Sequence, residues 1–141
     1  MKGTPLSCSA SLSFAGDNLD PDELRRVVPL KAKRWNRKGD LPRPSRSTSA
    51  PLRPARVGTC FFDSKPHVAS DDINDHVRFL LGIVSEHVAT LREIIEHRHL
   101  RWEIVCFFDI DAPNVDPKPF LRTDVLLFAE RLGIQVVPSL A

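Results

Sequence analysis

Apolar and polar residues alternate with a period of two near the start of the chain. Between residues 6 and 14, Leu, Cys, Ala, Leu and Phe occupy the even positions, and serine occupies every odd position. Such alternation places one set of side chains on each face of a β-strand. The pattern predicts a strand with one apolar face that packs and one hydroxyl face that meets water or a partner, as in an antiparallel or mixed sheet.

Further strands are predicted later in the chain. Residues 58–62, 102–108 and 134–137 are short segments rich in apolar residues, which is typical of strands. The segment 102–108 is almost continuously apolar, and this favours a central position in the sheet. A less regular pattern near residues 31–35 predicts a fifth strand.

A first, short helix is predicted after the first strand. Asp20 is suited to the N-cap and Pro21 to the first helical position, and Glu23 can reach back to complete a capping box. The helix ends at Pro29, because proline cannot continue a helix.

Two more helices follow from the spacing of apolar residues. After Ser70 as the expected N-cap, apolar residues recur at steps of three and four as far as Ile95, which predicts one long amphipathic helix. A third helix is predicted from Asp116 to Gly133, a residue suited to the helix end. The order of elements predicts a single α+β domain over residues 1–141. We expect a two-layer sandwich with a mixed or antiparallel sheet of four to five strands, one long helix and two shorter ones.

Composition narrows the class of protein. No apolar run approaches the roughly 20 residues that span a bilayer, and the first ten residues lack the apolar segment of a signal peptide. The chain has three cysteines, and an odd number argues against a disulfide framework and for a reducing compartment. We therefore expect a cytoplasmic protein without membrane contact, with Cys8 and Cys106 as buried free thiols.

Charge is distributed unevenly along the chain. Residues 25–56 contain eleven basic residues and one acid, a balance of +10, whereas the other residues carry nine basic and seventeen acidic side chains, a balance of −8. Within this tract, residues 36–56 form a Pro/Arg/Ser-rich basic loop, and the composition of 41–54 predicts a long mobile connection. The candidate partner-binding residues combine this loop with the adjoining sheet surface: Arg34, Trp35, Arg37, Lys38, Arg43 and Arg46.

The basic tract has three interpretations at this stage. It can be a solvated loop that the acidic remainder of the chain partly neutralises. It can recognise an acidic protein, because opposite charge accelerates encounter and selects partners. It can also bind nucleic acid, with arginines on phosphates and Trp35 as a stacking platform, although the acidic remainder would repel phosphates.

Catalytic and metal sites have weaker support in the sequence. Asp109 and Asp111 follow an apolar strand, as in phosphotransferases that use a nucleophilic Asp and Mg²⁺. Only thirty residues follow Asp111, and they supply no further acidic pair. His76 and His87 are expected to face solvent or to cap a helix, because no set of converging metal ligands accompanies them. We expect no catalytic residue, metal or cofactor.

The elements taken in order resemble a known family. The resemblance rests on the alternating first strand ending at Gly16, the run Asp20-Pro21-Asp22-Glu23-Leu24, Lys38-Gly39-Asp40, the basic loop, the long helix, the 102–108 strand and the closing Leu-Gly-Ile. Over roughly Ser7 to Val137 this set resembles the bacterial domain-of-unknown-function family 4279. The resemblance implies a small α+β protein with no established activity. Some members are encoded in toxin–immunity neighbourhoods, which implies a toxin-neutralising role.

These observations lead to three functional hypotheses. The first is a non-catalytic protein-binding module for an acidic protein partner, with an immunity protein that neutralises a toxin as its specific form. The alternative is a nucleic-acid-associated accessory protein that uses the same basic loop. The third is a small Mg²⁺-dependent phosphohydrolase built on Asp109 and Asp111.

Overall fold

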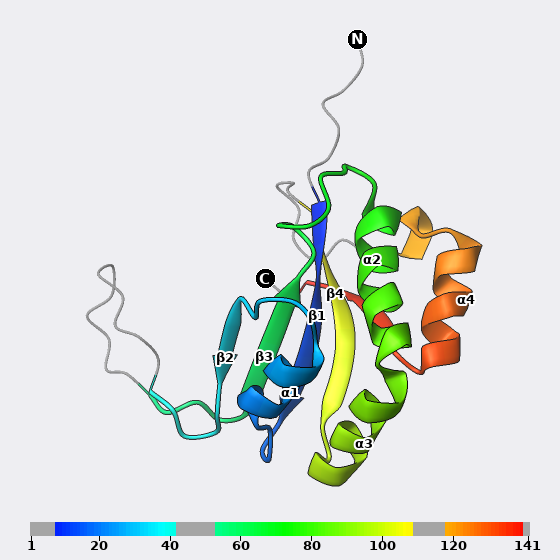
Figure 1. Ribbon diagram of the computed structural model, residues 1–141. Helices are drawn as coiled ribbons and strands as arrows, with labels where there is room; N and C mark the ends of the chain where they lie inside the picture. The colour runs from blue at the N-terminus through cyan, green and yellow to red at the C-terminus, as the bar shows by residue number, and fades with distance from the viewer. Residues whose placement is uncertain (1–7, 42–52, 109–117, 140–141) are drawn as a thin grey trace.

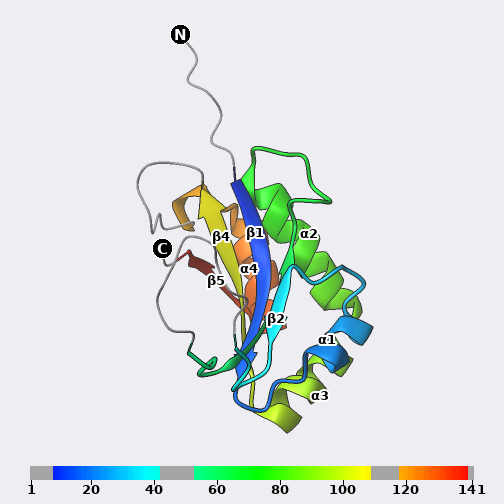
Figure 2. The ribbon, with the colours of Figure 1, turned by 90° about the vertical axis from the view of Figure 1, so that its left-hand side faces the viewer.

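The computed structural model describes residues 8–41, 53–108 and 118–139. The described elements follow in this order: β1 (Cys8–Gly16), α1 (Pro21–Val27), β2 (Arg34–Asn36), β3 (Gly58–Asp63), α2 (Ile73–Glu86), α3 (Val88–Arg98), β4 (Arg101–Phe108), a 3₁₀ turn η1 (Lys118–Phe120), α4 (Thr123–Leu132) and β5 (Gln135–Pro138). The strands form one sheet in the order β2-β3-β1-β4-β5, antiparallel except for the parallel pair β4 and β5. The helices lie on one side of this sheet (Figures 1 and 2). The predicted α+β fold is confirmed, and the sheet, expected to have four to five strands, is mixed and has five.

The core lies between the sheet and the helices. The apolar set of β1 points into it, and Leu12 and Phe14 are fully buried. Phe62 meets Phe14 edge to face, with 6.2 Å between ring centroids. From the helix side, α2 contributes Leu80 and Val84, also fully buried. Each such side chain contributes roughly 1.5–3 kcal/mol to stability by leaving water. The apolar residues of the strand pattern and those of the helix pattern thus pack together in one apolar layer.

The serine face of β1 differs from its prediction. Ser11 and Ser13 are buried, at 1% and 7% exposure, so the expected contact of this face with water is wrong at these two positions. The reason is the central place of β1: Ser11 lies in register between Asp63 and Val105 of the neighbouring strands, whose side chains are larger. The Ser11 hydroxyl oxygen has no hydrogen-bond partner among the described residues.

The predicted long helix is in fact two helices. The chain leaves helical geometry at His87, with φ −122° and ψ 19°, which ends α2 and begins α3. No proline or glycine marks this position, so the apolar spacing passes over it. The last turn of α3 is instead held by α1, where Arg98 donates to Glu23 at 2.8 Å. The N-cap of α2 is Asp72, which accepts from the Asn74 backbone N–H at 2.9 Å, and not the predicted Ser70.

Other helix boundaries agree in part with the sequence. Asp20 caps α1 and accepts from the Asp22 backbone N–H at 3.1 Å. Glu23 does not close the predicted capping box, because its carboxylate binds Arg98. Gly133, with φ 71°, ends α4 in the left-handed conformation that glycine adopts without strain. The predicted start of this helix at Asp116 lies outside the described residues, and α4 itself begins at Thr123. Within the described ranges, no helix has the length and apolar character needed to cross a bilayer.

Candidate functional site

The edge strand β2 carries two of the predicted partner-binding residues on its opposite faces. Trp35 is paired in register with the buried Cys60 and so lies on the helix side of the sheet, yet it is 44% exposed. The guanidinium of Arg25, from α1, lies 4.1 Å from its ring centroid, a cation–π contact. Arg34 is on the other face of the sheet, 5.3 Å from the ring of Phe61. The edge therefore presents an aromatic ring and two guanidinium groups.

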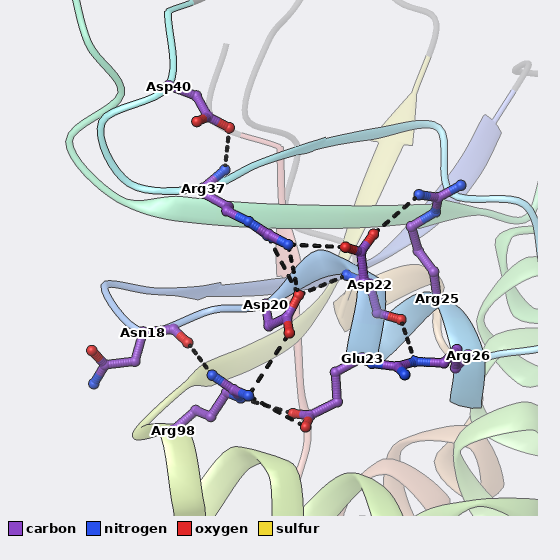
Figure 3. Close-up of polar contacts among 9 residues, drawn as sticks. All are labelled: Asn18, Asp20, Asp22, Glu23, Arg25, Arg26, Arg37, Asp40 and Arg98. Carbon is purple, nitrogen blue, oxygen red and sulfur yellow. Dashed lines mark hydrogen bonds and ion pairs between the residues drawn. The ribbon is translucent and has the colours of Figure 1, made fainter.

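Arg37 is tied to the beginning of α1 (Figure 3). Its guanidinium contacts Asp20 at 3.1 Å and Asp22 at 2.9 Å. Its backbone N–H donates to Asp40 at 2.8 Å, which holds the turn after β2. These pairs are largely exposed, so each contributes roughly 0–1 kcal/mol. Their main effect is to orient Arg37 toward its own chain.

Lys38 is paired in the same way, with its Nζ 3.3 Å from a carboxylate oxygen of Asp17. The basic tract is thus partly neutralised by acidic residues that precede it in sequence. For Arg37 and Lys38, this arrangement agrees with the interpretation of the tract as a segment that acidic residues of the same chain partly neutralise. Arg34 has no ion pair among the described residues.

Arg98 extends the same network to the end of α3. It donates to both carboxylate oxygens of Glu23 and to the backbone carbonyl of Asn18, and it lies 3.8 Å from Asp20. The hydrogen bonds to Glu23 raise the pKa of the Arg98 guanidinium above its ordinary value, against the opposing effect of burial. An open cleft of about 420 Å³ lies here, lined by Asp17, Asn18, Leu19, Asp20, Arg37, Lys38 and Arg98.

The charged side chains of this cleft form ion pairs with one another and with neighbouring residues of the same chain. Its cations and carboxylates face one another across short distances, so neither charge is free in excess for a phosphate or a metal ion. No serine, threonine or cysteine is among the residues that line it. Over residues 8–41, 53–108 and 118–139, no group of three or more His, Cys, Asp or Glu side chains has the geometry to hold a metal ion.

Four other residues singled out in the sequence lie outside the described residues. They are the partner-binding candidates Arg43 and Arg46 and the carboxylates Asp109 and Asp111. Their roles stay predictions.

A buried Ser–His pair was missed by sequence reasoning. Ser64 Oγ lies 2.6 Å from His76 Nδ1, and His76 Nε2 lies 2.7 Å from the backbone carbonyl of Ser70. A carbonyl only accepts, so Nε2 carries a proton, and in the neutral imidazole Nδ1 accepts from the Ser64 hydroxyl. Ser64 Oγ in turn accepts from the Ala10 backbone N–H at 3.0 Å. The hydrogen bonds thus connect β1, the end of β3 and α2.

This pair has the composition of a hydrolase nucleophile and base, but not its access. Ser64 is fully buried and His76 is 1% exposed, so a substrate cannot reach the hydroxyl. The prediction that His76 faces solvent or caps a helix is therefore wrong, because its imidazole joins buried elements. The lone histidine on an otherwise apolar helix face was the only sequence signal for it.

Cys8 and Cys106 are buried free thiols, as predicted, and Cys60 is a third. Burial raises the pKa of Cys60 and of Cys106 to about 12, and it also raises the pKa of Cys8. The thiolate is the reactive form of cysteine. These side chains are therefore protonated at neutral pH and serve packing.

Comparison with known proteins identifies one family. A family model described as a domain of unknown function, DUF4279, matches residues 6–138. No curated protein and no solved structure matches the chain.

Proposed function

The chain belongs to the DUF4279 family, and from this premise and the geometry of its β2 edge we propose that it is a non-catalytic protein-binding module. The observation that carries the proposal is Trp35, a large aromatic side chain that is 44% exposed on an edge strand. Tryptophan and arginine are the residues that most often dominate the binding energy of protein interfaces. Here the guanidinium of Arg25 lies over the ring, and Arg34 lies on the other face of the same strand.

Charge favours an acidic protein as the partner. Arg34 is exposed, whereas Arg37 and Lys38 are engaged by aspartates of the same chain. An acidic partner would have to compete with Asp20 and Asp22 for Arg37. Trp35 and Arg34 should therefore contribute more to binding than Arg37 and Lys38.

A toxin with an acidic active surface is one partner of this kind. Neutralisation by covering that surface would need no catalytic residue of this chain, in keeping with a binding module. The buried free thiols support a reducing compartment such as the cytoplasm as the site of action. Nucleic acid is less favoured as a ligand, because two of the tract's cations already face carboxylates.

The proposal can be tested with immobilised wild-type protein and two variants, Trp35→Ala and Arg34→Glu. Proteins captured from an extract of the source cells at about 150 mM salt would be identified and quantified. We expect an acidic protein on the wild type and its loss from both variants. A protein interface around a buried aromatic keeps most of its affinity at this salt, whereas non-specific binding to about six phosphates loses roughly three orders of magnitude between 50 and 200 mM.

A matched control is Arg131→Glu, which makes the same charge change at an exposed position of α4 and should leave capture unchanged. Equal capture by all four proteins would remove the β2 edge from consideration as the site. Salt-sensitive retention of random duplex DNA by the wild type, abolished by Arg34→Glu, would favour the nucleic-acid alternative.

A further inference from the structure

One face of the sheet has no described helix on it, and we call this face the open side. The described helices contact the face to which the buried apolar side chains of β1, β3 and β4 point, and Figure 2 looks obliquely onto the open side. This face includes Phe107, which is 41% exposed, and the half-buried Phe61, Val105 and Val137. No described helix or strand covers these side chains.

One row of residues across this face has an ordered sequence of charge and size. Strand register places Arg34 of β2 beside Phe61 of β3, Phe61 beside Ser13 of β1, and Ser13 beside Glu103 of β4. The row therefore reads positive, large, small, negative. The contact between the Arg34 guanidinium and the Phe61 ring shows that both point to the open side.

This row is complementary to the same row of a second copy when the second row runs in the opposite direction. A two-fold axis parallel to the strands, midway between β3 and β1, places β3 of one copy opposite β1 of the other. It also places β2 of one copy opposite β4 of the other. It sets Arg34 against the partner's Glu103 and Phe61 against the partner's Ser13. Each contact occurs twice, as in any isologous interface.

The next row obeys the same rule. Asn36, Thr59, Ala15 and Arg101 lie in register across the same four strands. The axis sets Asn36 against the partner's Arg101, and Thr59 against the partner's Ala15. No like charges meet in either row, and each larger side chain faces a smaller one or a polar group.

We propose that this face binds a second copy of the chain, forming a homodimer with two sheets inside and helices outside. Facing sheets pack about 10 Å apart with their strands aligned to within about 30°. Arginine and glutamate side chains can bridge this spacing. The Phe61 ring of each copy adds apolar area that leaves water on association.

Sedimentation velocity over a wide range of protein concentration tests the proposal with the full chain. We expect a species of about 32 kDa, twice the 15.9 kDa monomer. Glu103→Arg and Arg34→Glu each place like charges in contact twice, so each should raise the dimer dissociation constant at least about tenfold. The double variant Arg34→Glu/Glu103→Arg should restore dimerisation, because the pair is recreated in reverse.

Glu86→Arg is the matched control, since it makes the same charge change as Glu103→Arg at an exposed end of α2. It should dimerise like the wild type. A wild type that stays monomeric at every concentration overturns the proposal, as does a dimer that survives both single reversals or one that the double variant fails to restore. Glu103→Arg leaves Trp35 intact, so partner capture by this variant is a separate test of the β2 edge.

Discussion

The buried serines Ser64 and Ser11 provide a matched test of hydrogen bonding in this core. They are 0% and 1% exposed, and replacement by alanine removes the same oxygen atom from each. Ser64 accepts from the Ala10 N–H at 3.0 Å and lies 2.6 Å from His76 Nδ1. Ser11 Oγ has no partner among the described residues. The two substitutions therefore differ in the hydrogen bonds lost and little else.

The magnitude follows from the atoms left behind. Ser64→Ala leaves the Ala10 N–H and His76 Nδ1 without partners in buried surroundings, and each unsatisfied buried polar group costs about 1–3 kcal/mol. We expect a loss of about 3 kcal/mol in the free energy of unfolding. Ser11→Ala removes a buried hydroxyl that is itself unsatisfied, so we expect a change between zero and a gain of about 1 kcal/mol.

Urea and thermal denaturation at neutral pH measure both effects. A destabilisation of about 3 kcal/mol lowers the Tm of a domain of this size by roughly 10 °C, and the Ser11→Ala protein should melt at or above the wild-type Tm. Substitutions at a protein surface usually change the free energy of unfolding by no more than about 0.5 kcal/mol. If the free energies of unfolding of the two variants agreed within about that amount, the hydrogen bonds of Ser64 would add no measurable stability. The reasoning about this site would then be refuted.

Three further predictions concern titration, thiol reactivity and packing. Hydrogen bonds from the Asn74 side chain and backbone lower the pKa of Asp72 below its ordinary 3.8. Asp72 therefore stabilises the fold above about pH 4, and this contribution is lost as the pH falls through the lowered pKa. In Asp72→Asn the side chain still caps the helix but does not titrate, so the free energies of unfolding of this variant and of the wild type, measured by denaturation at a series of pH values, should converge in acid. The three thiols should resist iodoacetamide at about pH 8 in the native state and react in urea, as followed by mass spectrometry. Gly58→Ala would place a Cβ 2.9 Å from the Gly16 carbonyl oxygen, and we expect about 1–3 kcal/mol of destabilisation in a urea titration.

Local sequence patterns were sufficient for the elements whose signal is contained in neighbouring residues. The period-two alternation of residues 6–14 predicted β1, because strand geometry turns every second side chain to the same face. Asp20 and Gly133 marked a helix start and a helix end, because capping and the left-handed conformation depend on one residue and its immediate neighbours.

The sequence by itself therefore determined the fold class, the positions of the strands along the chain, and the uneven charge of the tract at residues 25–56. Only the tertiary structure decided how those parts are used. It broke the long helix at His87, where α3 turns to bring Arg98 onto α1. It paired Arg37 with Asp20 and Asp22, and it brought His76 to Ser64. Ion pairs and buried hydrogen bonds depend on which segments the fold brings within about 3 Å, and no local pattern encodes that distance.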